Sequence, residues 1–369
     1  MKLENVELLH VAVPLVAPFR TSFGEETMHE VVLVHVVTDV GEGWSECVAM
    51  ERPAYSSEYG AGAEAVMREF LIPALYAEGS ALTAERVEDA FRWVKGHRMA
   101  KAALETAVLD AQLRGANQSL ASYLGAVKDR VPSGVSVGIM NSLGELETAV
   151  RSYLDAGYLR IKLKIEPGWD LEPVRMVRQT FGDDILLQVD ANTAYTRADG
   201  AHLAQLDEFN LLLIEQPLDE EDILGHAMLA RDVRTPICLD ESIVSAAIAG
   251  DAIDLGATTV INIKPGRVGG YIESVRIHDV CSERGIPVWC GGMLETGVGR
   301  AANVALAALP NFTLPGDTSA SSRYFAEDIT VPFVLEDGHV AVPQGPGIGV
   351  EPIADTLARF TVSRESVRA

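Results

Sequence analysis

Two patterns of hydrophobic positions divide the chain near residue 130. In the first part, β-branched residues alternate with polar ones or form short runs, which predicts strands over residues 3–14, 30–38 and 42–49. Gly41 and Gly43 supply a tight turn between the last two of these strands. Apolar residues at helical spacing then predict helices over residues 57–77, 82–95 and 98–116. We therefore expect an α+β unit built on an antiparallel three-stranded meander.

From about residue 131 the pattern becomes a repeat of short apolar runs about 25 residues apart. The runs cover residues 134–139, 160–165, 185–190, 211–216, 236–241, 260–264, 286–292 and 312–317. The segments between them are long enough for one helix each, as at 170–181, 198–208 and 269–284. Buried strands that alternate with helices are typical of parallel βαβ units, and eight of them favour a closed α/β barrel over an open doubly wound sheet.

The predicted domains follow these patterns. Residues 1–125 are expected to form an α+β capping domain, and residues 126–322 the barrel. The stretch 323–352 is again β-like and rich in turns. We therefore expect residues 323–369 to return to the capping domain.

Charged side chains end five successive apolar runs of the repeat. They are Lys164, Asp190, Glu215, Asp240 and Lys264, at spacings of 26, 25, 25 and 24 residues. Because the carboxyl ends of barrel strands meet at one rim, these side chains are expected to converge there. Three carboxylates without His or Cys favour a hard cation, most simply Mg²⁺, with the three acids as its ligands.

The lysines suit one class of chemistry. Lys162 and Lys164 lie two positions apart on a strand and therefore point to the same side. We interpret Lys164 as a general base and Lys162 as its electrostatic modulator, with Lys264 on the opposite side of the substrate. A dication flanked by two bases is suited to removing a proton next to a carboxylate. Asn192 and Glu241 are expected to support the metal ligands by hydrogen bonds.

Composition excludes several other functions. The chain carries 30 Lys and Arg against 53 Asp and Glu, a formal charge of −23, which disfavours nucleic acid and anionic membranes as partners. No run of 18 apolar residues and no signal-peptide pattern occurs in the sequence, so a cytoplasmic protein is expected. The four cysteines lack metal-site spacing and are expected to be buried, reduced thiols. A small-molecule carboxylate is the expected partner.

Three further motifs have simpler interpretations. The GVSVG segment at 134–138 matches a nucleophile elbow, but Ser136 alternates with valines as in a strand and is expected to face the barrel interior and the pocket. The GVGRAA segment at 297–302 is interpreted as a helix entry rather than a dinucleotide site. The glycines of GGMLET at 291–296 serve a turn, a close backbone approach to ligand, or both.

Taken together, these residues resemble the enolase superfamily and, within it, the muconate lactonizing enzyme subgroup. The phrases closest to the branch of o-succinylbenzoate synthases and N-succinylamino acid racemases are RIKLKIEPGWD, VDANTAY, IEQPL, CLDES, NIKPGRVGG, WCGGMLETGVGRAAN and LPGDTSAS. The resemblance spans essentially the whole chain. It implies an α/β fold with a modified TIM barrel of the (β/α)7β type and an α+β capping domain, Mg²⁺ with Mn²⁺ as a substitute, and a homo-oligomer, either a dimer or an octamer.

The resemblance also implies an activity. The main expectation is dehydration of 2-succinyl-6-hydroxy-2,4-cyclohexadiene-1-carboxylate to o-succinylbenzoate, a step of menaquinone synthesis. Lys164 would take the α-proton and return it to the leaving hydroxyl, while Lys264 stabilises the enediolate. The alternative is an N-succinylamino acid racemase, with the two lysines as acid and base, or an enzyme with both activities. A non-catalytic barrel protein is the alternative of another class.

The substrate contacts are likewise implied by the resemblance. A specificity loop corresponds to residues 19–25, and Arg267 matches a position associated with racemase-capable members. The expected contacts are Phe19, Phe23, Met50, Tyr55, Ser136, Asn192, Arg267, Gly292 and Met293.

Overall fold

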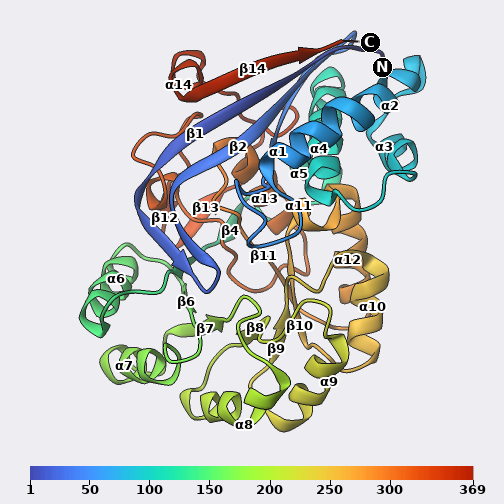
Figure 1. Ribbon diagram of the computed structural model, residues 1–369. Helices are drawn as coiled ribbons and strands as arrows, with labels where there is room; N and C mark the ends of the chain where they lie inside the picture. The colour runs from blue at the N-terminus through green and yellow to red at the C-terminus, as the bar shows by residue number, and fades with distance from the viewer. Residues whose placement is uncertain (369) are drawn as a thin grey trace.

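The computed structural model describes residues 1–368 and begins with an antiparallel sheet (Figure 1). Its strand order is β14-β1-β2-β3, and its strands are β1 Leu3–Thr21, β2 Gly24–Thr38, β3 Glu42–Cys47 and β14 Thr361–Val367. The first two strands are longer than predicted and form one hairpin that reaches the barrel rim. There the backbone N–H of Ile139 donates to the carbonyl of Arg20 at 2.9 Å.

Helices cover one side of this sheet, and together they form what we call the sheet domain. They are α1 Gly60–Val66, a π-helical turn Met67–Leu71, α2 Ile72–Ala77, α3 Ala84–Phe91, α4 Arg98–Gly115 and α5 Leu120–Leu124. Helix α4 lies directly against β3, where a Cβ on Gly43 would collide with the carbonyl of Ala107. Gly43 therefore lies within β3 rather than in the predicted turn, and its lack of a side chain permits close helix packing.

The second part is a curled parallel sheet with strand order β11-β10-β9-β8-β7-β6-β5. Its strands are β5 Gly134–Val137, β6 Arg160–Lys164, β7 Leu186–Asp190, β8 Ile214–Glu215, β9 Ile237–Leu239, β10 Val260–Ile263 and β11 Val288–Cys290. The helices around it are α6 Leu143–Asp155, α7 Leu171–Phe181, α8 Gly200–Leu203, α9 Ile223–Asp232, α10 Ala246–Asp254, α11 Pro265–Val268, α12 Tyr271–Glu283 and α13 Gly297–Ala307. The helix predicted at 198–208 is mostly 3₁₀.

The predicted eighth strand, residues 312–317, is not a regular strand. It lies between β11 and β5 and is joined to them by single bridges, Val288 with Phe312 and Ser133 with Gly316. Pro315 lacks an N–H to donate, which explains why a continuous ladder does not form here. The segment nevertheless occupies the position that closes the barrel.

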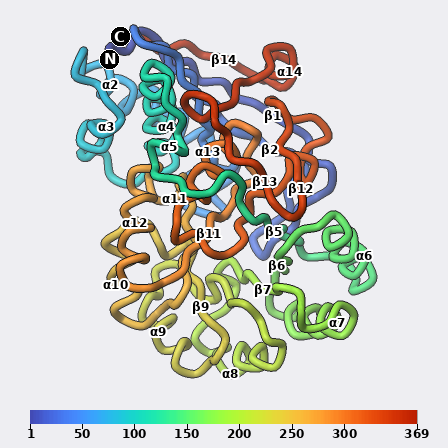
Figure 2. The backbone as a smooth tube through the Cα atoms, turned by 180° about the vertical axis from the view of Figure 1, so that it is seen from behind, coloured from blue at the N-terminus to red at the C-terminus, as the bar shows by residue number. Residues whose placement is uncertain are grey.

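The C-terminal stretch divides between the two parts of the molecule. Strands β12 (Leu335–Glu336) and β13 (His339–Ala341) pair with β4 (Arg130–Pro132) in a small separate sheet rather than with the N-terminal sheet. Beyond α14 (Ala354–Phe360), β14 pairs with β1, from Val6 opposite Val367. The two chain ends therefore lie side by side, as Figure 2 shows from behind.

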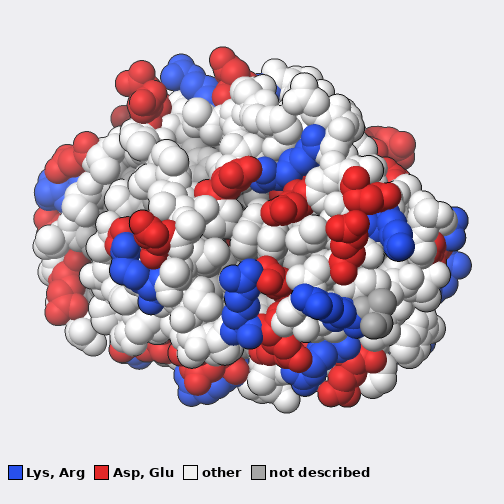
Figure 3. Space-filling model, turned by 90° about the horizontal axis from the view of Figure 1, so that it is seen from above, with Lys and Arg blue, Asp and Glu red and all other residues white. Residues whose placement is uncertain are grey.

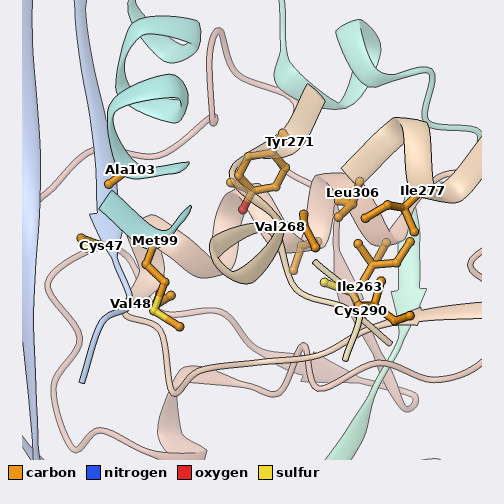
Figure 4. Close-up of a cluster of buried hydrophobic side chains, with 14 of the residues drawn as sticks. Cys47, Val48, Met99, Ala103, Ile263, Val268, Tyr271, Ile277, Cys290 and Leu306 are labelled. Atoms are coloured by element: carbon orange, nitrogen blue, oxygen red, sulfur yellow. The ribbon is translucent and has the colours of Figure 1, made fainter. Parts of the chain in front are cut away.

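One buried apolar cluster extends across both parts. Figure 4 shows Cys47 and Met99 of the sheet domain in the same cluster as Tyr271 and Cys290 of the barrel. All four cysteines are buried free thiols, as predicted. Because the core is continuous, the sheet domain is held against the barrel rather than tethered to it.

Acidic and basic side chains are interspersed on one face of the molecule (Figure 3). On the face in Figure 3, basic side chains stand beside acidic ones rather than in a continuous basic area. Within residues 1–368, no helix has the length and apolar character needed to cross a membrane.

Glu105 of α4 links the sheet domain to the barrel and generates a prediction about stability. Its buried carboxyl accepts the backbone N–H groups of Tyr271 at 2.8 Å and Ile272 at 3.3 Å, and burial raises its pKa to about 8. The folded state thus binds a proton that the unfolded chain releases above its ordinary pKa of 4.5. Stability should therefore fall between pH 5 and pH 8, by about 3–5 kcal/mol from this group.

Glu105→Gln keeps an accepting oxygen without the titration. In urea unfolding at several pH values, its stability should decline less from pH 5 to pH 9 than that of the wild type. Glu283→Gln, at an exposed site on α12, is the matched control and should follow the wild-type curve. Parallel curves for the wild type and Glu105→Gln would contradict this assignment.

Candidate active site

The ends of the barrel strands bring the predicted charged residues together. Strand β6 carries Lys162 and Lys164, whose register partners on β7 are Gln188 and Asp190. Glu215 ends β8, opposite Cys238, while Asp240 and Lys264 immediately follow β9 and β10. Parallel strands in register set their last side chains at one level, which explains the regular spacing in the sequence. All of these charged side chains are buried.

Lys162 lies at the centre of the carboxylates. Its Nζ is 3.2 Å from Asp190 Oδ2, 3.2 Å from Glu215 Oε2 and 2.6 Å from Asp317 Oδ2. Burial by itself lowers the pKa of Lys162, but the three carboxylates outweigh it and hold that pKa above its usual value. Lys162 is therefore a fixed positive charge rather than a proton donor or acceptor.

Lys164 is held from within the barrel. Its Nζ donates to Asp190 Oδ2 and to Asn192 Oδ1, both at 2.6 Å. The Asn192 amide in turn donates to Glu241 Oε1 at 2.8 Å. Asn192 lies two residues beyond the end of β7 and has a left-handed backbone with φ of 42°. Asn192 thus links Glu241 to the lysine, and its backbone N–H donates to Asp190 Oδ1 at 3.0 Å.

Lys264 is held partly by a residue outside the barrel, in the segment that follows β3. Its Nζ is 2.7 Å from Asp240 Oδ2 and donates to the hydroxyl of Tyr55 at 3.0 Å. Tyr55 lies in the segment after β3 and its hydroxyl donates to Asp240 Oδ2 at 3.3 Å. The guanidinium of Arg267 packs over the Tyr55 ring, with Cζ 5.6 Å from the ring centroid. It also donates to the backbone carbonyl of Asp240 at 3.1 Å.

A cavity of about 180 Å³ opens above these lysines, between the sheet domain and the barrel rim. Most of the residues expected to contact substrate line it together with both outer lysines. They are Phe19, Phe23, Met50, Tyr55, Lys164, Asn192, Lys264, Gly292 and Met293. The segment expected as a loop at residues 19–25 is the tip of the β1–β2 hairpin, with a turn of only two residues.

Two expected contacts do not line this cavity. Arg267 is buried behind Tyr55, and Ser136 points into the barrel opposite Lys162. The Ser136 hydroxyl is buried without a hydrogen-bond partner in the part of the chain that the structure describes. Ser136 is in strand β5, and Gly297 opens helix α13, in agreement with the interpretation of both motifs.

Sequence comparison relates this site to known enzymes. The profile of the mandelate racemase / muconate lactonizing enzyme N-terminal domain matches residues 4–125, and that of the enolase C-terminal domain-like family matches residues 145–356. The chain belongs to the enolase superfamily. The predicted family and fold class are thereby confirmed, as is the prediction of an enzyme of this superfamily.

The relatives of this chain include proteins named for each of the two activities that the sequence analysis left open. An N-succinylamino acid racemase from Amycolatopsis sp is 65% identical over 364 residues, which cover 99% of each chain. An o-succinylbenzoate synthase from Geobacillus kaustophilus is 47% identical over 363 residues, covering 98% of this chain and 96% of that protein. A crystal structure of an enolase superfamily member from Listeria innocua superposes with a TM-score of 0.95 at 40% identity, covering 100% and 99% of the two chains.

Enzymes of the enolase superfamily generally use Mg²⁺, and the donor chemistry of the site fits that ion. As the side chains stand, no three acidic, His or Cys groups within residues 1–368 are placed to hold an ion together, because the acids pair with lysines. Two buried carboxylate oxygens nevertheless accept no hydrogen bond and have only ion-pair contacts: Glu215 Oε2 lies 3.2 Å from Lys162 Nζ, and Asp240 Oδ1 lies 3.4 Å from Arg267 Nε. Burial and the neighbouring charges of Asp190 and Asp240 outweigh the effect of Lys162 and raise the pKa of Glu215 well above its usual value.

Sequence reasoning missed Asp317. Its carboxylate lies between Lys162 and Arg160, at 2.6 Å and 2.8 Å, and the two cations hold its pKa below the usual range despite burial. Asp317 ends the eighth apolar run, so the rule that found the other acids would have found it too. Asn262, whose amide donates to Glu215 Oε1 at 2.7 Å, was also missed; it lies inside a run that otherwise looks apolar.

Replacing Asp317 tests how strongly it compensates the buried cations. Asp317→Asn keeps the shape but leaves Lys162 and Arg160 short of one negative charge, and should lower the free energy of unfolding by about 3–5 kcal/mol. Urea unfolding at pH 7 measures this change in the free energy of unfolding. Asp183→Asn, at an exposed carboxylate, is the control and should change stability little. A loss below about 1 kcal/mol would contradict the compensating role.

Proposed function

We propose that this protein removes the proton next to the carboxylate of succinyl-bearing substrates. It racemises N-succinylamino acids, and it dehydrates 2-succinyl-6-hydroxy-2,4-cyclohexadiene-1-carboxylate to o-succinylbenzoate. The observation that supports this most is that two lysines, Lys164 and Lys264, border one cavity from strands four positions apart in the sheet. Such a pair can reach a bound carbon atom from both faces.

In racemisation, each lysine acts on one face of the α-carbon. The lysine that is unprotonated takes the α-proton, and the ammonium on the other side gives a proton to the opposite face. The product is the other enantiomer, and the two lysines have exchanged protonation states. Lys162, which remains charged, stabilises the negative charge that develops on the substrate carboxylate.

Dehydration needs only one of these bases. Lys164 takes the proton from the ring carbon that bears the carboxylate, and then returns it to the hydroxyl that leaves the neighbouring carbon as water. The electron pair of the broken C–H bond forms the new double bond of the aromatic ring. Lys264 remains an ammonium and stabilises the intermediate charge. The presence of relatives of both names supports one site for the two reactions.

Asp190, Glu215 and Asp240 are the residues we propose to hold Mg²⁺, with Mn²⁺ as a substitute. Their oxygens suit a hard cation, and two of these oxygens lack hydrogen bonds. The ion would supply positive charge that stabilises the negative charge developing on the substrate carboxylate. Asp190 and Asp240 now contact Lys164 and Lys264.

Two lysine variants test the two-base assignment. With N-succinyl-methionine in D₂O, Lys164→Ala and Lys264→Ala should each lose racemisation by about 100- to 10,000-fold, and each should lose α-proton exchange for a different enantiomer. NMR and circular dichroism measure exchange and racemisation. Lys95→Ala, at an exposed site, is the control. Exchange of both enantiomers in either catalytic variant would contradict the assignment.

Dehydration is followed separately by ultraviolet absorbance of the cyclohexadiene. Wild-type racemisation with no detectable dehydration would remove the synthase activity from the proposal and leave a dedicated racemase.

Metal binding is tested by thermal unfolding. After treatment with EDTA, adding Mg²⁺ should raise the Tm of the wild type, because an ion that binds only the folded state stabilises it, by about 2.7 kcal/mol at 100 times Kd. Glu215→Gln should show a much smaller rise, whereas Glu283→Gln should match the wild type. An unchanged wild-type Tm, together with full activity in EDTA, would contradict the metal site.

A further inference from the structure

A buried histidine borders the same cavity on the side of the sheet domain. His29 of β2 is among the lining residues, and its side chain is only 6% exposed. Its Nε2 lies 3.0 Å from Oε1 of Glu46 on β3, whose side chain is fully buried. No step of the proposed reactions uses this pair.

Glu46 is built to remain an anion. It also accepts the backbone N–H and hydroxyl of Thr296 and the backbone N–H of Gly299, at the start of helix α13. Burial raises the pKa of Glu46, but the hydrogen bonds from His29 and Thr296 outweigh it and the pKa is lowered. The carboxylate can only accept, so Nε2 of His29 must be the donor.

The other ring nitrogen is therefore the one available to a ligand. Nδ1 of His29 has no hydrogen-bond partner within residues 1–368, and the ring borders the cavity. Because Nε2 already donates to Glu46, a second proton on the ring is carried by Nδ1, which is then a donor. This edge of the ring is consequently suited to an anion.

Few other cations on the cavity wall could take that role. Lys164 and Lys264 are engaged at the reacting carbon, and Arg52 is exposed. Glu26 also borders the cavity, but burial raises its pKa, which reduces the repulsion that it would exert on an anion. Glu30 is paired with His10 at 3.2 Å.

We propose that His29, hydrogen-bonded to Glu46, binds the far carboxylate of the succinyl group. This inference rests on the proposed function. Both proposed substrates carry this carboxylate, so one subsite would serve both reactions. His29 is then a specificity residue, and its role is to distinguish succinyl from uncharged acyl groups.

The His29–Glu46 pair also joins β2 to α13, so a loss of activity alone would not separate binding from structure. The test therefore compares two substrates, N-succinyl-methionine and N-butanoyl-methionine, which differ by a carboxylate in place of a methyl group. Hydrogen bonds to charged groups contribute about 1.5–3 kcal/mol, or roughly 10- to 100-fold in kcat/KM. The wild type should prefer the succinyl substrate by that margin.

His29→Gln should lower kcat/KM for the succinyl substrate at least about tenfold more than for the butanoyl one. His29→Arg retains a cation and should keep most of the preference. His35→Gln is the matched control, since His35 lies on the same strand, is buried, pairs with Glu7 and Glu42, and does not line the cavity. Its substrate preference should equal that of the wild type.

The outcomes separate this inference from the function on which it rests. A wild type that racemises neither substrate overturns the proposed racemase function. An active wild type with equal kcat/KM for both substrates overturns the role of His29 even if no variant folds. Equal losses on both substrates in His29→Gln overturn it as well, because they indicate a structural role only.

Discussion

The site depends on the contacts between the buried ammonium group of Lys162 and the carboxylates around it. This group is buried in the barrel, 4.8 Å from the centre of the Trp289 ring, and contacts carboxylates from three different segments. A buried charge is tolerated only when such partners surround it. The same contacts fix β7, β8 and the closing segment at 312–317 relative to β6, so compensating one charge also sets the positions of the acids.

The sheet domain forms the other side of the site. The β1–β2 hairpin reaches the rim, where Arg20 pairs with Glu166 at 3.1 Å and the Ser22 hydroxyl donates to the carbonyl of Asn192 at 3.3 Å. The hairpin tip thus contacts the loop that positions Lys164. The cavity wall and the proposed catalytic groups consequently belong to one packed structure, which is consistent with the continuous core beneath them.

The sequence predicted the parts of this structure that follow from local periodicity. The strand ends and their charged residues could be placed because parallel strands repeat at a regular spacing, and the family could be recognised from the phrases around them. The contact of Tyr55 with Lys264 spans 209 residues and depends on how the sheet domain sits on the barrel. No local pattern encodes such a contact. The hairpin was predicted too short because Pro14, Pro18 and the polar run at 24–27 interrupt the alternation that marks a strand.

The two lysines differ in what holds them, and this difference bears on how one site could serve two reactions. Lys164 is held by Asp190 and Asn192, which both belong to the barrel. Lys264 shares its partner Asp240 with Tyr55, so its position depends also on the sheet domain. A reaction that needs one base draws on the barrel alone for its proton transfers, whereas a two-base reaction requires the sheet domain to be seated as well. In the proposed function, racemisation is therefore the activity that depends more closely on the packing between the two parts of the molecule.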